Sequence, residues 1–68
     1  MTENEKVAFE HLCTSVSGYV SITHNIRRFG DGIISEVYQA YADESIIISD
    51  DCPTPMEAVD ELLKLMNE

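Results

Sequence analysis

The chain has 68 residues, of which 44% are hydrophobic and 25% charged, a composition that excludes intrinsic disorder and fits one small domain, residues 1–68. Thirteen acids against four bases give a formal net charge of −9, which argues against a nucleic-acid-binding face and repels anionic membranes. No apolar run approaches the roughly 20 residues of a membrane span. Acids also follow Met1 where a secretory signal carries bases, so we expect a cytoplasmic protein.

The first predicted element is a short helix over residues 4–13, capped at its N-terminus by Thr2 or Asn4. An apolar stripe recurs along it at helical spacing, with Val7 or Ala8 behind the stripe. The stripe consists of Phe9, Leu12 and Cys13. A helix this short depends on tertiary packing, so we expect it to lie beside the rest of the fold or to form a dimer contact.

From residue 16 to residue 29 the chain changes to a period of two, which predicts a half-buried β-strand rich in β-branched side chains. The predicted inward positions are Val20, Ile22, His24 and Ile26. Asp31-Gly32 follows and predicts a type I′ turn, because both central positions of that turn require positive φ. A second strand then begins at Ile33 and pairs antiparallel with the first.

A two-residue turn sets the register of the predicted hairpin. It places Ile26 opposite Val37, so that apolar side chains meet, and Arg27 opposite Glu36, so that a base meets an acid. A shift of one residue would exchange the two faces of the second strand. The register predicts an inward sheet face composed of Val20, Ile22, Ile26, Val37, Tyr41, Ile46 and Ile48.

The polar pair Asp43-Glu44 predicts a second turn, of a longer or bulged kind because neither residue favours positive φ. A third strand over residues 45–49 follows, with Ile46 and Ile48 inward. The outer sheet face is then predicted to carry Tyr19, Phe29, Ile34, Tyr38 and Ile47. This apolar share is large for a solvated face and predicts a partner surface or a homodimer contact there.

Thr54-Pro55-Met56-Glu57 has the pattern of a helix start, since the threonine hydroxyl accepts from the Glu57 N–H and Pro55 takes the first helical position. One apolar stripe follows at i, i+3, i+4 and i+7: Val59, Leu62, Leu63 and Met66. The complete order predicts an α+β domain (αβββα) of a helix, a three-stranded antiparallel sheet and a C-terminal helix packed on one sheet face.

No constellation in the sequence indicates catalysis or a metal site. His11 and Cys13 are the nearest Cys/His pair, but at i, i+2 of a helix they point to different sides. Together with His24 and Cys52 they match the ligand number of zinc without its paired spacing. We therefore expect no enzyme activity, no catalytic residue, no metal and no cofactor, and two reduced thiols.

Two stretches of the chain carry partial resemblances to known families. The order of elements resembles that of double-stranded RNA-binding domains, and it implies the fold alone because residues 54–57 lack the bases those domains use. Residues 46–65, in which the segment from Asp51 to Ala58 leads into the helix, resemble the ending of HicB-like antitoxins, which implies a dimeric regulator. The size and acidity are similar to those of short accessory proteins of phages and mobile elements, some of which inhibit host nucleases.

Acidic residues gather in one part of the sequence, since residues 29–63 contain nine acids and neither lysine nor arginine. Spaced carboxylates compete with nucleic acid for grooves lined with Lys and Arg. We expect a non-enzymatic, phage-type inhibitor or regulator that binds a basic, nucleic-acid-handling protein and itself contacts neither nucleic acid nor membrane. The expected partner-binding residues are Glu36, Tyr38, Asp43, Glu44, Asp50, Asp51, Glu57, Asp60 and Glu61, with Phe29 as a further aromatic anchor.

Three alternatives stay open at this point. In the first, the protein is an antitoxin-like or transcription-associated regulator that dimerises through its exposed sheet face. In the second, which has less support, it is a small enzyme. In the third alternative the acidity only keeps a small protein soluble.

Overall fold

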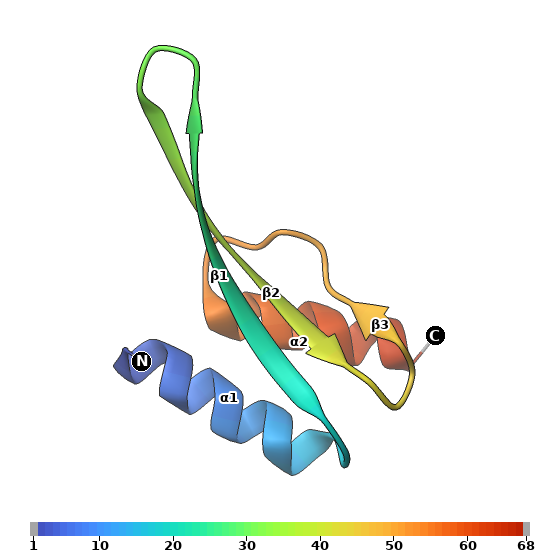
Figure 1. Cartoon of the computed structure of the whole chain (residues 1–68). Helices are drawn as coiled ribbons and strands as arrows, with labels where there is room; N and C mark the ends of the chain where they lie inside the picture. The colour runs from blue at the N-terminus through green and yellow to red at the C-terminus, as the bar shows by residue number, and fades with distance from the viewer. Residues whose placement is uncertain (1, 68) are drawn as a thin grey trace.

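Two helices pack on one face of a three-stranded antiparallel sheet, in a computed structural model that describes residues 2–67 apart from the side chains of Phe29 and Ile33 (Figure 1). The chain order is α1, β1, β2, β3, α2, and the sheet order is β1-β2-β3. These elements span, in turn, Glu3–Ser15, Val20–Phe29, Ile33–Ala42, Ile47–Ile48 and Pro55–Met66. The predicted α+β fold with its C-terminal helix against the sheet is confirmed.

Helix α1 begins with Thr2 as its N-cap, where the threonine hydroxyl accepts a hydrogen bond from the Glu5 N–H at 3.2 Å. Of the predicted apolar stripe, only Leu12 is fully buried, with Ala8 beside it on the inner face. Cys13 is exposed, because the face of α1 toward the core is set by residues 8 and 12 and continues into Val16. The predicted position of α1, beside the rest of the fold, is confirmed by its packing on β1 and α2.

Helix α2 starts as its sequence predicts. The Thr54 hydroxyl accepts from the Glu57 N–H at 3.2 Å, and Pro55 occupies the first turn, where a missing N–H has no helical partner to lose. Val59 and Leu62 are 0% exposed, and Leu63 and Met66 pack half-buried against the same core. Local capping and the helical stripe therefore agree with the tertiary structure along this element.

The register of the β1–β2 hairpin differs by one residue from the prediction. Val20 pairs with Ala42 and Phe29 pairs with Ile33, so the loop has three residues, 30–32. Gly30 and Gly32 take positive φ, of 49° and 104°, whereas Asp31 does not. The predicted type I′ turn requires positive φ at Asp31, and a loop with a glycine at each end avoids that strain.

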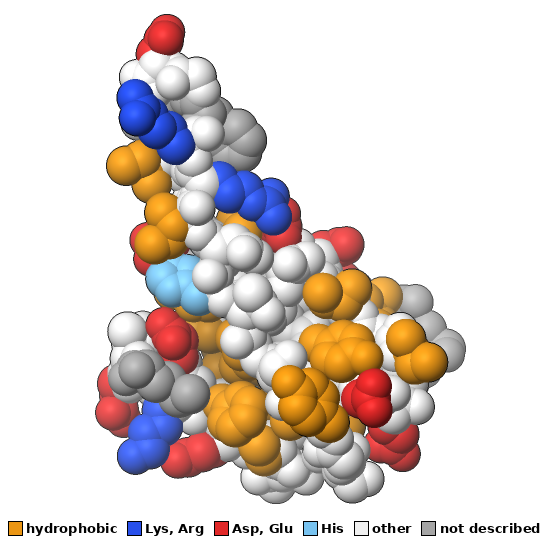
Figure 2. All heavy atoms as spheres, in the orientation of Figure 1, with side chains coloured by type: hydrophobic (Ala, Val, Ile, Leu, Met, Phe, Trp, Pro, Cys, Tyr) orange, Lys and Arg blue, Asp and Glu red, His pale blue; other side chains and the backbone are white. Residues whose placement is uncertain are grey.

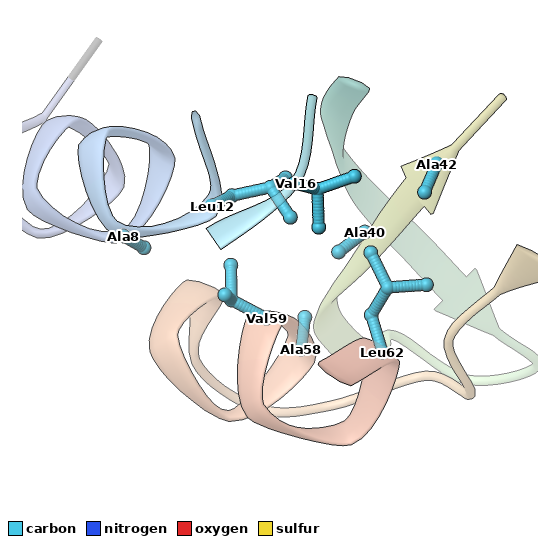
Figure 3. Close-up of a cluster of buried hydrophobic side chains, with 8 residues drawn as sticks. All are labelled: Ala8, Leu12, Val16, Ala40, Ala42, Ala58, Val59 and Leu62. Atoms are coloured by element: carbon cyan, nitrogen blue, oxygen red, sulfur yellow. The ribbon is translucent and has the colours of Figure 1, made fainter. Parts of the chain in front are cut away.

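The one-residue shift reverses the two faces of β2. Ala40 and Ala42 are 0% exposed beneath the helices, and Tyr38 packs half-buried on the same face. The predicted inward positions Val37 and Tyr41 lie on the opposite face, so this part of the prediction is wrong. Small alanine side chains let α2 approach β2 closely, and Val59 and Leu62 of α2 share one buried cluster with these alanines and with Leu12 of α1 (Figure 3).

Strand β3 is shorter than predicted and faces the other way. A turn over residues 43–46 precedes it, with Ile46 at a positive φ of 51°, so a turn longer than two residues is confirmed. Ile47 packs against the core, whereas Ile46 and Ile48 are 80% and 53% exposed. Tyr41 pairs with Ile48, and both lie on the face opposite the helices, which corrects the predicted inward positions of β3.

The far end of the hairpin extends beyond both helices and gives the molecule extents of 41 × 26 × 16 Å (Figure 1). We call residues 25–37 the arm. Ile26 and Ile34 lie on the helix side of the sheet, but they are 67% and 70% exposed because no helix reaches them. The prediction that Ile26 belongs to the buried face is therefore correct for the face and wrong for the burial.

Candidate functional site

The predicted partner-binding residues fall into separate groups in the fold. The largest group, which we call the acidic cluster, surrounds Cys52 and consists of Asp50, Asp51, Glu57 and Glu61. Glu36 and Tyr38 belong to a second group around His24. Asp43, Glu44 and Asp60 lie outside both groups. The structure thus brings together four of the nine predicted residues.

The acidic cluster is built by the segment between β3 and α2 and by the first two turns of α2. Cys52 fixes that segment, because its N–H and C=O bond with the backbone of Tyr38 at 3.0 and 2.7 Å on the side of β2 away from β1. The Thr54 cap then turns the chain into α2. Two loop acids and two helix acids are held at one edge of the sheet in this way.

The Cys52 thiol lies in the electrostatic field of these carboxylates. Partial burial raises the pKa of the Cys52 thiol above its usual value of 9.0, and the charges of Glu61, Glu57, Asp50 and Asp51 raise it further. The thiol is therefore neutral at physiological pH. Four carboxylates that act on one sulfur atom form a concentrated negative field at the protein surface.

One base of the chain is bound to this cluster. The Arg27 guanidinium Nη1 donates to Asp51 Oδ2 at 3.2 Å, which links the arm to the segment before α2. The predicted pairing of Arg27 with Glu36 is wrong, because the observed register places Arg27 opposite Ser35. Arg27 therefore offsets part of the negative charge at Asp51.

The second group joins α1 to the base of the arm. His24 Nε2 lies 2.8 Å from Glu36 Oε1, and His24 Nδ1 lies 4.0 Å from Glu5 Oε1. The imidazole stacks on the Tyr38 ring with centroids 4.4 Å apart and planes 9° from parallel. Partial burial raises the pKa of Tyr38, and the carboxylates of Glu36 and Glu5 add to this effect. Sequence reasoning missed the group, because the predicted register put Gln39, and not Tyr38, opposite His24.

The remaining predicted residues make local contacts. Asp43 Oδ1 accepts from the Tyr41 hydroxyl at 2.9 Å, and this hydrogen bond, with burial and charge, raises the pKa of Tyr41. Glu44 accepts weakly from the Ser17 hydroxyl at 3.4 Å. Asp60 lies 4.0 Å from the His11 imidazole, across the contact of the two helices. These acids do not extend the acidic cluster.

The sheet face opposite the helices carries an apolar patch at the base of the hairpin. Tyr19 and Tyr41 meet edge to face with centroids 6.4 Å apart, and Ile48 pairs beside Tyr41. Figure 2 shows hydrophobic side chains gathered over this part of the molecule. The prediction that Tyr38 lies on this face is wrong, since Tyr38 faces the helices; the Phe29 side chain lies outside the described residues.

Within residues 2–67 there is no pocket, and no three His, Cys, Asp or Glu side chains are placed to hold a metal ion. In the same part of the chain neither helix has both the length and the apolar character to traverse a bilayer. Comparison with family models, with curated proteins and with solved structures finds no match for the chain. A functional proposal therefore rests on the chemistry of the surface itself.

Proposed function

We propose that this protein is a non-enzymatic interaction module that binds a basic, nucleic-acid-handling protein through its acidic cluster and inhibits or regulates that protein. The observation that carries the proposal is the convergence of Asp50, Asp51, Glu57 and Glu61 around Cys52. Two loop acids and two helix acids thus present negative charge from a single edge of the fold.

The physical basis is competition for cationic grooves. Proteins that handle nucleic acid bind phosphates with Lys and Arg, and a carboxylate accepts the same charge-assisted hydrogen bonds. Asp50, Asp51 and Glu57 are exposed, and Glu61 is half-buried, so their oxygens meet a partner without a change of fold. Exposed ion pairs contribute only about 0.2–1 kcal/mol each, so several must act together, and binding must weaken with salt.

The experiment compares two variants of equal net charge on immobilised oligolysine, a probe of the basic surface. The test variant neutralises the cluster with Asp50→Asn, Asp51→Asn, Glu57→Gln and Glu61→Gln. The control variant neutralises four acids elsewhere with Glu3→Gln, Glu10→Gln, Asp31→Asn and Glu44→Gln. We expect the test variant to elute at clearly lower salt than the control, because only the cluster concentrates charge.

The same variants identify the natural partner. Wild type and control, immobilised and exposed to a cell extract, should retain basic nucleic-acid-handling proteins that the test variant loses, and free nucleic acid should displace them. Equal elution of both variants from oligolysine would show that only total charge matters. Retention that is insensitive to salt would also contradict the proposal.

A further inference from the structure

Strand β1 presents an open edge along its whole length. The Tyr19 carbonyl accepts from the Asp43 N–H at 3.0 Å, which in an antiparallel ladder assigns the odd-numbered residues of β1 to bonding with β2. The backbone groups that point away from β2 are those of Val20, Ile22, His24, Ile26 and Arg28. Across the described part of the chain, these groups have no backbone partner beyond the β1–β2 ladder.

The arm exposes apolar surface next to this edge. Ile26 and Ile34 are 67% and 70% exposed on the helix side of the sheet, in line with the buried positions at the base of the hairpin. Arg28 pairs with Ile34 and lies on the same side. An unpaired strand edge beside exposed isoleucines is a template for the addition of another strand.

Helix α1 lies where an added strand would need cover. It packs on β1 and α2 but not on β2, and Figure 1 shows it on the side of β1 away from β2. A strand added to β1 therefore lies above α1. Helix α1 carries three acids, Glu3, Glu5 and Glu10, and one base, Lys6, so this cover is negatively charged.

We propose that β1 pairs antiparallel with β1 of a second copy of this chain and joins the two sheets into one. Antiparallel pairing brings the arm of each copy over α1 of the other. Ile34, uncovered in one copy, is then covered by α1 of the other copy, Ile26 packs against its own counterpart, and Arg28 meets the acids of that helix. The contact is isologous, so each residue pair in it occurs twice in the dimer.

Charge complementarity chooses the register. When Ile26 faces its own counterpart across the two-fold axis, His24 of one copy faces Arg28 of the other. Glu5 lies 4.0 Å and Glu36 lies 2.8 Å from the His24 ring, so an arginine entering there meets two carboxylates. The acidic clusters remain at the two outer edges of the joined sheet, beyond the β2 side of each copy, where repulsion between them is screened.

The decisive experiment uses charge exchange between copies. Arg28→Glu alone places a new carboxylate against Glu5 of the other copy, and Glu5→Arg alone places a second guanidinium against Arg28, so each variant should remain monomeric. A mixture of the two variants restores an opposite-charge pair at both halves of the contact. We expect light scattering after size exclusion to give twice the 7.6 kDa chain mass for wild type and for the mixture, and the single mass for each variant alone.

Disulfide trapping tests the register, in a background with Cys13→Ser and Cys52→Ser. Ile26→Cys should cross-link two copies on mild oxidation, because this residue faces itself, and Ser21→Cys should not. Circular dichroism confirms that each variant is folded. A wild-type monomer over the whole dilution series, or a mixture that stays monomeric, would overturn the proposal, as would a cross-link at residue 21 in place of 26.

Discussion

At the base of the hairpin Ala40 is completely buried, whereas in the arm Ile34, on the same face of the same strand, is 70% exposed. Ten-residue strands reach about 33 Å, and helices of 13 and 12 residues reach about 20 Å, so the strands extend past their cover. The comparison teaches that burial in this fold follows the reach of the helices and not the hydrophobicity of the strand. The base forms the core, whereas the arm exposes isoleucines on the face that is buried at the base.

The largest expected effect comes from a charge introduced at the buried base, compared with the same charge introduced in the exposed arm. Leu62→Asp should abolish folding or lower the free energy of unfolding by at least about 3 kcal/mol, because it loses apolar burial and adds an unpaired carboxylate to the core. Ile34→Asp in the arm should change the unfolding free energy of the monomer by less than about 0.5 kcal/mol. Urea denaturation followed by circular dichroism measures both, and similar losses would contradict the difference between base and arm.

The second prediction tests which face of β2 is buried. Ala40→Leu should lower the free energy of unfolding by about 1–3 kcal/mol, because the added atoms meet Leu62 and Val59 in a filled space. Thr23→Leu adds a large side chain at an exposed position on the opposite face and should have little effect. A stabilising effect of Ala40→Leu would support the register predicted from the sequence, in which Ala40 faces away from the helices, and would contradict its burial at the base.

The third prediction concerns the loop that ends the arm. Gly32 has φ of 104°, and a Cβ there meets no atom within 4 Å, so Gly32→Ala is opposed by backbone strain alone. We expect a loss of about 1 kcal/mol, seen as faster hydrogen exchange in the arm, with the base unchanged. Gly30→Asn is the matched control, since φ of 49° lies in the region that asparagine tolerates. Equal effects of the two substitutions would argue for a different loop.

The smallest expected effect is a pH dependence at the base. The hydrogen bond to Asp43 raises the folded-state pKa of Tyr41 above the usual 10.0, so its contribution to stability is complete below pH 10 and is lost as pH rises through the folded value. The thermal unfolding temperature of wild type should therefore fall more steeply above pH 10 than that of the Tyr41→Phe variant. Parallel curves would show that the Tyr41–Asp43 contact does not persist in solution.

The candidate site was predictable in part. The four acids of the cluster were among the nine predicted residues, because Asp50, Asp51, Glu57 and Glu61 flank a helix start that the sequence states clearly. Their separation from Glu36, Tyr38 and Asp43 was not predictable. Distances between groups on β2 and groups on α2 depend on the strand register and on which sheet face the helices cover. The spacing of residues along the sequence determines neither of these.

The hairpin register shows why sequence reasoning fails at this point. Opposing Ile26 with Val37 and Arg27 with Glu36 satisfied cross-strand chemistry, yet the chain pairs Ile26 with Glu36 and Arg27 with Ser35. Cross-strand pairs contribute at most about 1 kcal/mol each, whereas the two helices bury Leu12, Val59 and Leu62 completely. The fit of helix side chains over Ala40 and Ala42 therefore outweighs the pairing preferences of the strands.

By itself, the sequence determined the order of the elements, the cap at Thr54, the buried stripe of α2 and the acidity of residues 29–63. These features depend on contacts within a few residues, where spacing and side-chain chemistry are sufficient. Only the tertiary structure decided the loop of three residues, the buried alanines, the gathering of four acids at Cys52 and the uncovered arm. Each of these depends on how closely two short helices approach a longer hairpin, which is a property of packing in three dimensions.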